Sequence, residues 1–338
     1  MATRKGKQTV IMDDPPSISA WASVAGKKEH EGPLGPFFDI TSDDTTFGQA
    51  SWEKGESEMV RKTISTLLKK ASLNPEELDC IFAGDLLNQC VGTTFGLRSF
   101  GIPLFGLYGA CSTMSEGINL ASLLVESGAV NNAAATASSH FCTAERQYRY
   151  PLEYGGVRPP TTQWTATACG AVLIDKGGKP PFVRAVTVGT VEDKGVTDQN
   201  NMGAAMAPAA AKTLTRFLSD TGMAPSQFDA IVTGDLGLVG SRLLYELCDA
   251  EGVDIRKNHT DCGLLLFDRE HQDVHAGGSG CGCSASVLST VFLPEIQRGS
   301  LKNILFMATG ALLSPTTVQQ KESIPSIAHL AWISHEKG

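Results

Sequence analysis

The chain has 338 residues, of which 42% are hydrophobic and 19% are charged, and its formal net charge is -8. This length supports a large hydrophobic core and exceeds one ordinary domain. The negative charge argues against nucleic acid or an anionic membrane surface as a general partner. The net charge does not exclude a small anionic ligand, because the groups that line a pocket determine the electrostatic potential inside it.

The cysteines and the N-terminal segment indicate the cellular compartment in which the protein works. Nine cysteines occur without a regular spacing, which is typical of reduced thiols rather than of a disulfide framework or a metal site. The N-terminus is basic, but no apolar segment follows it, and no run approaches 18 apolar residues. We therefore expect no signal peptide and no transmembrane helix. If the protein works at a membrane, another component holds it there.

The first part of the chain alternates strand and helix patterns. Residues 8–12 are predicted to form a strand, and residues 13–58, rich in Pro, Gly, Asp and Ser, to form irregular loops. Residues 58–71 have helical spacing, with apolar side chains on one face and basic ones on the other. Residues 80–84 then form a short buried strand.

The stretch 109–116 is the focal point of the first half. It lies between an apolar run, 103–108, and a helical pattern, 116–127, which predicts a strand, a tight turn and a helix with Cys111 at the turn. The positive end of a helix dipole favours a thiolate, so we expect the pKa of Cys111 to fall below the ordinary value of about 8.5. The alternative is that Cys111 is one more buried, inert cysteine.

Two strands and a long connection complete the first half. Residues 132–138 and 166–174 are predicted to be buried strands. Residues 140–163 between them, rich in Arg, Tyr and Pro, are predicted to form a long loop. Such loops in compact domains are usually functional or disordered. We expect this one to be functional, with surface solvation or a subunit contact as the alternative. Residues 176–181 are a hairpin or linker.

The pattern then restarts, which indicates an internal repeat. A strand (182–190), a loop (195–206), a helix (209–221) and a strand (230–234) follow. Adding 150 to each number from 62 to 86 aligns the halves with nine identities in 25 positions. Such a repeat indicates duplication. The sequence therefore predicts an α/β fold in which residues 1–178 form one half and residues 179–338 the other, with mixed sheets and helices between and outside them.

Several motifs of this duplicated chain resemble the thiolase superfamily, which includes the ketoacyl synthases. The Cys111 turn is similar to the nucleophile elbow of that family. Residues 168–173 resemble the strand that ends the first half, 275–280 the His-Pro and glycine-rich loop, and 307–310 the glycine-rich C-terminal turn. The resemblance covers nearly the whole chain. It implies layered αβαβα architecture with two mixed five-stranded sheets, and a homodimer.

The chain departs from these enzymes at their catalytic positions. Asp235 stands where the synthases have a His, Gly and Ser replace the second-half Asn, and Ala308 or Thr309 stands where thiolases need a second Cys. A Claisen condensation needs an oxyanion hole and a base or proton carrier beside the thiolate. We therefore expect no catalytic residue, with Cys111 and His275 as vestigial candidates. The alternative is an acyl-transfer or condensing enzyme that uses Cys111 as nucleophile and His275 as base.

A narrower resemblance is to a family of sporulation proteins with a degenerate thiolase fold from endospore-forming bacteria. The segments that carry it are 40–44, 82–89, 107–113, 141–149 and 277–284. It implies binding of dipicolinic acid (pyridine-2,6-dicarboxylate), free or as its calcium chelate, and a part in moving it into the developing spore and out at germination. Membrane proteins of the same operon would form the path, and the chain would be peripheral on the spore inner membrane. No cofactor is implied apart from calcium carried with the ligand.

Dipicolinate is a flat aromatic dianion, so its site needs N–H donors or guanidinium groups for two carboxylates and a face for the ring. The helix start at Cys111 and the loop 277–284 supply backbone amides, and the long loop adds arginine and tyrosine. The alternative role for Asp235 is a turn cap, and that for His275 is a core histidine. For the whole protein, the third hypothesis is a structural subunit with a vestigial cavity. The expected ligand-binding residues are Cys111, Ser112, His140, Arg146, Arg149, Asp235, His275, Gly278, Ser279, Cys283 and Thr309.

Overall fold

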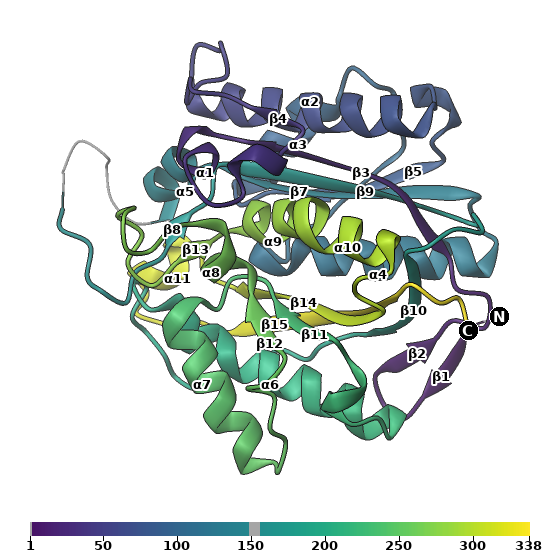
Figure 1. Ribbon diagram of the computed structural model, residues 1–338. Helices are drawn as coiled ribbons and strands as arrows, with labels where there is room; N and C mark the ends of the chain where they lie inside the picture. The colour runs from purple at the N-terminus through teal and green to yellow at the C-terminus, as the bar shows by residue number, and fades with distance from the viewer. Residues whose placement is uncertain (1, 149–155) are drawn as a thin grey trace.

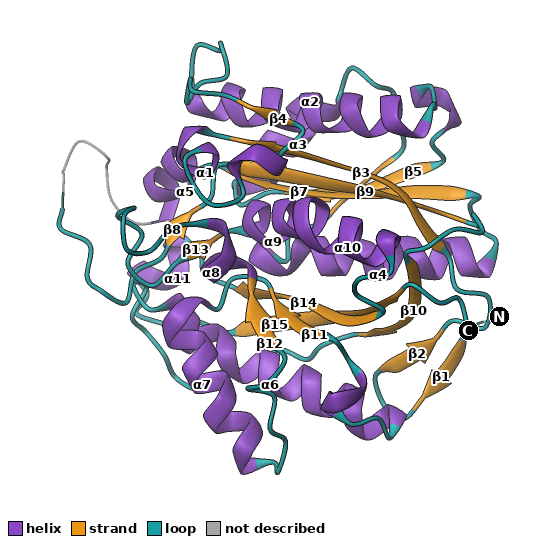
Figure 2. Ribbon diagram, in the orientation of Figure 1, coloured by secondary structure: helices purple, strands orange, loops and turns teal. Residues whose placement is uncertain are grey.

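The structure, a computed structural model, describes residues 2–148 and 156–338. Its elements form five alternating layers of helix and sheet (Figures 1 and 2). Helices cover both outer faces, and a further layer of helices lies between the sheets. From the top of Figure 1 downwards, the helices of these layers are α2 (Trp52–Ala71) and α3 (Val91–Leu97), then α4 (Thr113–Ser127), α9 (Cys281–Val287) and α10 (Leu293–Arg298), then α6 (Met202–Thr221) and α7 (Gly237–Ala250).

Two sets of five strands form the sheets, and both sets mix parallel and antiparallel neighbours. In spatial order, the first set is β3 (Ser17–Ala25), β9 (Ala168–Asp175), β7 (Asn132–Ser139), β5 (Cys80–Gly84) and β6 (Leu104–Gly106). The second set is β12 (His259–Asp261), β11 (Ala230–Thr233), β14 (Asn303–Ala311), β15 (Ser326–Ser334) and β10 (Phe182–Thr187). A single residue pair, Phe182 with Ser17, joins β10 to β3. The predicted fold class is confirmed. The pairing that joins the two sheets was not predicted from the sequence.

Shorter elements surround these layers. The N-terminal hairpin pairs with β10 of the second set rather than with the first. The remaining strands and α-helices are β1 (Thr3–Lys5), β2 (Thr9–Ile11), α1 (Lys27–His30), β4 (Ile40–Thr41), α5 (Phe141–Tyr148), β8 (Trp164–Thr165), α8 (Cys262–Leu266), β13 (Gly278–Ser279) and α11 (Pro315–Gln319).

The internal repeat is visible in the helix bounds. Helices α2 and α6 begin and end 150 residues apart, and the short 3-10 turns Pro75–Glu77 and Pro225–Gln227 follow them with the same offset. Both helices begin with a polar N-cap, since the side chains of Ser51 and Asn201 accept hydrogen bonds from backbone amides of the first turn. The same local signals therefore start the same element in each half.

Helix α4 is the centre of the molecule because it lies between the two sheets (Figure 1). A helix in that position must be apolar on more than one face. Met114, Ile118, Ala121 and Val125 are completely buried, and each of the larger side chains contributes about 1.5–3 kcal/mol on burial. The alanine-rich strand β7 allows the helix to approach its sheet closely. Cys111 precedes this helix, so its position is fixed by the packing of both halves.

Two segments that the sequence predicts as loops are ordered elements. Strand β3 falls inside the segment 13–58, and helix α5 inside 140–163, so both loop predictions are wrong there. Strand β3 reads SISAWASVA, where small Ser and Ala hide the strand signal. Seven of its nine residues are buried, so tertiary pairing rather than propensity makes it a strand. Helix α5 spans only eight residues, which is too short for a clear period.

The start of α6 also differs from the prediction. The sequence places a helix at 209–221, directly after Pro208, but the helix begins at Met202 and contains Pro208 in its second turn. Proline lacks the N–H that would bond to the carbonyl one turn earlier, which costs one hydrogen bond without ending the helix. Because the helix begins seven residues earlier than predicted, Met202 and Met206 lie on the same face of α6.

A buried carboxyl pair, Glu56 and Asp85, makes the fold sensitive to alkaline pH. Burial, and then the charge of Asp85, raise the pKa of Glu56 to about 8, and its carboxyl accepts hydrogen bonds from Ser138 (3.1 Å) and Thr143 (2.8 Å). The folded-state pKa lies above the unfolded value, so the folded state holds the additional proton. This contribution to stability is complete below the unfolded pKa and is lost as the pH rises through the folded pKa.

Replacing Glu56 by Gln removes this titration while keeping the shape of the side chain. We expect the unfolding free energy of the wild type to fall between about pH 5 and about pH 8, by up to about 1.4 kcal/mol per pH unit from this group, and that of Glu56→Gln to fall less. Urea denaturation across the pH range measures both, with Glu76→Gln on the surface as the control. An equal decline in wild type and Glu56→Gln contradicts the assignment.

Candidate functional site

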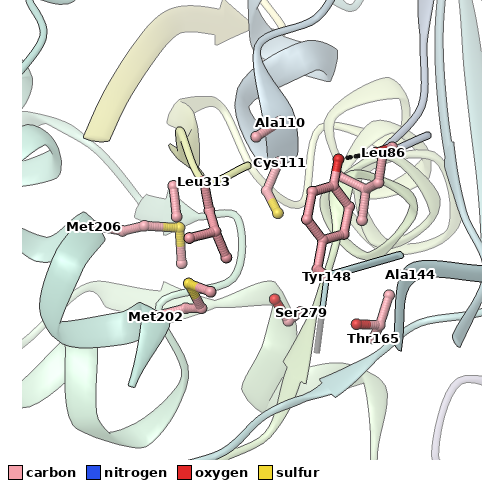
Figure 3. Close-up of a pocket in the computed structure, with 11 residues that line it drawn as sticks. Leu86, Ala110, Cys111, Ala144, Tyr148, Thr165, Met202, Met206, Ser279 and Leu313 are labelled. Carbon is pink, nitrogen blue, oxygen red and sulfur yellow. Dashed lines mark hydrogen bonds between the residues drawn. The ribbon is translucent and has the colours of Figure 1, made fainter. Parts of the chain in front are cut away.

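The Cys111 turn connects β6 to α4 through a 3-10 turn, Ala110–Ser112. Ala110 has a φ of 52°, a left-handed conformation that is strained for a residue with a Cβ atom. Gly310 on β14 lies against this turn, because a Cβ there would be 2.3 Å from the carbonyl oxygen of Gly109. The strained turn and the close approach of β14 place the Cys111 side chain in the interior (Figure 3).

The thiol of Cys111 lies beside the buried carboxyl of Asp235, and each of the two groups shifts the pKa of the other. One carboxylate oxygen of Asp235 accepts hydrogen bonds from the Ser279 hydroxyl (3.0 Å) and the Gly280 amide (2.9 Å), and the other accepts one from the Thr309 hydroxyl (3.0 Å). The structure therefore brings together four of the predicted ligand-binding residues, Cys111, Asp235, Ser279 and Thr309. They come from both halves of the chain.

The electrostatics of this cluster oppose a thiolate. Burial raises the pKa of Cys111 well above its usual range, and the negative charge of Asp235 raises it further. Burial also raises the pKa of Asp235 to about 7 and that of the neighbouring Asp261 to about 6. The expectation of a lowered Cys111 pKa is therefore wrong, because loss of hydration outweighs the helix dipole.

Asp235 is not a simple turn cap, although its repeat partner is. Asp85 accepts hydrogen bonds from the backbone amides of Leu87 (2.8 Å) and Thr93 (2.7 Å). In the second half the corresponding turn is capped by Asp261, which accepts from the Leu236 amide at 2.9 Å. Asp235 therefore does not cap this turn, and its side chain faces Cys111.

A small cavity of about 60 Å³ adjoins Cys111. In Figure 3 the methionine side chains and Leu313 lie on one side of the thiol and the Tyr148 ring on the other, with the Ser279 and Thr165 hydroxyls at its base. Mostly apolar walls with a few polar groups are typical of small-molecule sites. None of its described lining residues is Arg, Lys or His. They are Leu86, Ala110, Cys111, Ala144, Tyr148, Thr165, Met202, Met206, Ser279, Ala311 and Leu313.

Tyr148, on α5, closes one wall of the cavity. Its hydroxyl donates a hydrogen bond to the Leu86 carbonyl (Figure 3) and lies 3.1 Å from the hydroxyl of Tyr108. The sequence predicts that tyrosine from the long loop contributes to the site, and Tyr148 belongs to that loop, but the methionines and Leu313 in the cavity wall were not predicted. Met202 and Met206 are four residues apart on α6, so a helix extended past Pro208 would have placed both on one face.

Other predicted ligand-binding residues lie outside this cavity. Arg146 forms an ion pair with Glu53 and lies over the ring of Trp52. His140 is buried with Nε2 2.7 Å from the Thr45 carbonyl, and burial lowers its pKa. The ring of His275 lies 3.3 Å from the Asp273 carboxylate and is one-third exposed.

The remaining predicted residues surround the cluster without lining the cavity. The Ser112 hydroxyl donates to the Gly109 carbonyl at 2.7 Å. The carbonyl of Gly278 accepts from Gln163 at 2.7 Å, and the Cys283 thiol faces the carbonyl of Gly234 at 3.8 Å. Arg149 lies outside the described residues. In the part of the chain that is described, no group of three or more His, Cys, Asp or Glu side chains is arranged to hold a metal ion.

The chain has a thiolase-like fold. The structure is similar to 3-oxoacyl-[acyl-carrier-protein] synthase III from Aquifex aeolicus, with a TM-score of 0.55 and 13% identity, covering 94% of this chain and 99% of that one. It is also similar to a variant of OleA from Xanthomonas campestris, with a TM-score of 0.60 and 14% identity, covering 96% of this chain and 99% of that one. At these identities the likeness shows the fold alone.

The chain belongs to the stage V sporulation protein AD family, whose model matches residues 6–334. It is 43% identical over 324 residues to stage V sporulation protein AD of Bacillus subtilis (strain 168), covering 96% of each chain. The narrower resemblance to sporulation proteins is thereby confirmed. Among the described residues, no helix has the length and apolar character needed to cross a bilayer.

The buried Cys111 thiol is expected to react slowly. We predict that iodoacetamide at neutral pH modifies Cys111 no faster than Cys142, the partly exposed cysteine on α5. Replacing Asp235 by Asn removes a negative charge beside the thiol and should increase the rate at Cys111, by about tenfold for each unit by which its pKa falls. Peptide mass spectrometry measures both rates.

The rate at Cys142 and the melting temperature serve as controls for the folding of the Asp235→Asn variant. Rapid modification of wild-type Cys111, ahead of Cys142, contradicts the assignment of a neutral thiol.

Proposed function

We propose that the protein binds dipicolinic acid, free or as its calcium chelate, in the Cys111 cavity, and that it supports uptake of this compound into the developing spore and its release at germination. Its partners would be the membrane proteins of the stage V sporulation A operon, which hold it peripherally on the spore inner membrane. Membership of the sporulation family supports the proposal, and the observation that carries it is the cavity at the Cys111–Asp235 cluster.

The chemistry of the cavity suits a flat aromatic ligand. The Tyr148 ring and the side chains of Met202, Met206 and Leu313 offer apolar surface to a ring, and the Thr165 hydroxyl offers a hydrogen bond to a carboxylate. A volume of about 60 Å³ holds only a few waters at about 10–15 Å³ each. Entry of a ring therefore requires the unbranched methionine side chains to change rotamer.

The charge of the ligand must be balanced within the cavity. A free dianion is repelled by Asp235 when that carboxyl is ionised, and none of the described lining residues supplies a positive charge. Two routes reduce the repulsion. Asp235 can hold a proton, since its pKa is raised to about 7, or the ligand can bring calcium, which neutralises its carboxylates.

The acyl-transfer alternative has weaker support. Asp235 occupies the place beside the thiol where a general base would stand, and it raises the pKa of Cys111. His275, the other candidate base, lies against Asp273 outside the cavity lining. We therefore propose that the protein is not a condensing enzyme.

Incubation with acetyl-CoA tests this directly. We expect intact-mass spectrometry to show no acetyl adduct on the wild type, because the neutral thiol is a poor nucleophile. An adduct that is absent from Cys111→Ser would support the acyl-transfer enzyme instead.

Blocking the cavity is the sharpest test of the ligand site. Leu313 lines the cavity and the adjacent Leu312 does not, so Leu313→Trp and Leu312→Trp form a matched pair. We expect calorimetric titration with dipicolinate, with and without calcium, to show binding to the wild type and to Leu312→Trp, and at least about tenfold weaker binding to Leu313→Trp. Equal affinity of the two variants places the ligand elsewhere.

Absence of binding in the wild type under both conditions contradicts the proposal and favours a structural subunit with a vestigial cavity. Benzene-1,3-dicarboxylate, which lacks the ring nitrogen, serves as the ligand control.

The pH dependence of binding follows from Asp235. Protonation of its carboxyl below about pH 7 removes the repulsion, so we expect the affinity for free dipicolinate to rise by roughly three- to tenfold from about pH 8 to about pH 6. The calcium chelate should show a smaller dependence. Titration at both pH values measures this, and Asp235→Asn should bind free dipicolinate with little change over the same range. Stronger binding at the higher pH contradicts a role for Asp235.

A further inference from the structure

A chain of hydrogen bonds leads from α7, on the outer face of the second sheet (Figure 1), to the carboxyl of Asp261. The Tyr245 hydroxyl lies 2.9 Å from Nδ1 of His259, and Nε2 of the same ring lies 2.9 Å from the Thr233 hydroxyl. That hydroxyl donates to Oδ2 of Asp261 at 2.6 Å. Tyr245 and His259 are partly exposed, whereas Thr233 and Asp261 are completely buried. The chain therefore connects partly exposed side chains to the interior without a gap.

The charge of Asp261 determines the direction of every bond in this chain. An ionised carboxylate only accepts hydrogen bonds, so Thr233 donates to it, Nε2 of His259 donates to Thr233, and Tyr245 donates to Nδ1. A protonated Asp261 donates to Thr233 instead. The chain then runs in the opposite direction, and the ring proton of His259 is on Nδ1. The tautomer of His259 therefore reports whether Asp261 carries a proton.

Asp261 lies next to the Asp235 turn. Its carboxyl oxygens accept hydrogen bonds from the amides of Leu236 (2.9 Å) and Gly237 (3.0 Å), the two residues that follow Asp235. A negative charge on Asp261 raises the pKa of Asp235, so the two carboxyls titrate as a pair. Asp261 is not among the described residues that line the Cys111 cavity. It therefore acts on the cavity through the charge of Asp235.

The titratable groups that face Asp261 come from α7, β12, α8, α9 and the end of β11. Arg256 lies over the Tyr245 ring, 5.5 Å from its centroid, but its guanidinium is paired with two exposed carboxylates. Burial raises the pKa of the two neighbouring thiols well above the usual range, so both are neutral. Asp235, with a pKa of about 7, is the one group among them that titrates near Asp261, with a pKa of about 6. The groups are Tyr245, His259, Asp235, Cys262 and Cys283.

We propose that Tyr245, His259 and Thr233 form a proton path from solvent to Asp261, and that the proton on Asp261 sets the charge of the Asp235–Cys111 cluster. In each transfer one O–H or N–H bond forms as another breaks. Water or a buffer acid gives a proton to the Tyr245 oxygen as the Tyr245 proton moves to Nδ1. The Nε2 proton moves to Thr233, and the Thr233 proton moves to Asp261. The net change is one proton taken from solvent and bound by Asp261, without oxidation or reduction.

The path explains how two completely buried carboxyls reach equilibrium with solvent. Without it, proton exchange at Asp235 and Asp261 requires local opening of the fold. The consequence for ligand binding rests on the proposed function, because it uses the charge of Asp235 beside the cavity. The proton path itself does not depend on that function.

The tautomer of His259 tests the direction of the chain. We expect NMR of nitrogen-labelled histidine to show the proton on Nε2 at about pH 8 and on Nδ1 at about pH 5, because Asp261 gains its proton between them. Burial lowers the pKa of His259 itself to about 4, so the ring stays neutral over this range. His329 is the control, since its Nδ1 accepts from the Gly189 amide at 3.3 Å and its tautomer should not change. A constant tautomer of His259 in the wild type overturns the proposal.

The rate of proton uptake tests the path. Time-resolved infrared spectroscopy after a pH jump follows the Asp261 carboxyl, whose band is assigned by its loss in Asp261→Asn. We expect Thr233→Val, which keeps the shape of the side chain without its hydroxyl, to slow protonation at least about tenfold. Thr260→Val on β12 is the matched control and should leave the rate unchanged. His259→Gln should slow uptake equally, which decides the question if Thr233→Val does not fold. Rates equal to that of the wild type overturn the path.

The titration of Asp235 tests the second part of the proposal. We expect Asp261→Asn to lower the pH at which the Asp235 carboxyl band titrates by about one unit, because a neighbouring negative charge is removed. Asp43→Asn, which changes an 81%-exposed carboxyl, should have no effect. An unchanged Asp235 titration in Asp261→Asn overturns this part.

Dipicolinate titration then connects the charge to the ligand. In Asp261→Asn the rise in affinity for free dipicolinate should move to lower pH by the same amount as the Asp235 band. Binding that keeps the pH dependence of the wild type, while the Asp235 band moves, overturns the connection to the ligand. If the wild type binds no dipicolinate at all, the proposed function fails, while NMR and infrared spectroscopy still decide the proton path.

Discussion

The Asp235 carboxylate is the group on which the geometry of the site depends. Ser279, Gly280 and Thr309 donate hydrogen bonds to it, and Cys111 contacts it, so one side chain connects the end of β11 to three segments distant in the sequence. An unpaired buried carboxylate would cost several kcal/mol. Three donors and a raised pKa offset that cost, because the carboxyl is either well solvated by the protein or protonated.

The same burial explains why the Cys111 turn differs chemically from the nucleophile elbow that it resembles. The helix dipole of α4 favours a thiolate, but its effect is at most about 2 kcal/mol. Desolvation of an ionised group in the interior costs several kcal/mol, and the adjacent carboxylate adds repulsion. Burial and Asp235 therefore determine the protonation state of Cys111. A cysteine that precedes a helix is not reactive for that reason alone.

The duplicated halves could be predicted from the sequence because the repeat leaves identical residues at a fixed offset, and α2 and α6 keep that offset to the residue. Strand β3 and helix α5 could not, since a strand of Ser and Ala and a two-turn helix have no local signal and depend on tertiary packing. Cys111, Asp235, Ser279 and Thr309 are four of the eleven residues predicted for the site, and the structure brings these four together; their role in binding stays a prediction. Arg146 was predicted for its charge and His275 from the resemblance of its loop to that of the thiolases, and each lies beside an acidic partner outside the cavity lining.

The cavity beside Asp235 has no cationic side chain among its described lining residues. This restricts the charge of the ligands that it can bind. A permanently charged anion meets repulsion there, whereas a ligand that changes its net charge by binding a proton or a metal ion does not. The Cys111 cavity is thus better suited to a chelate or to a partly neutralised acid than to a free dianion at high pH. Under the proposed function, the buried Asp235 carboxyl beside Cys111 would make this site select ligands by their charge.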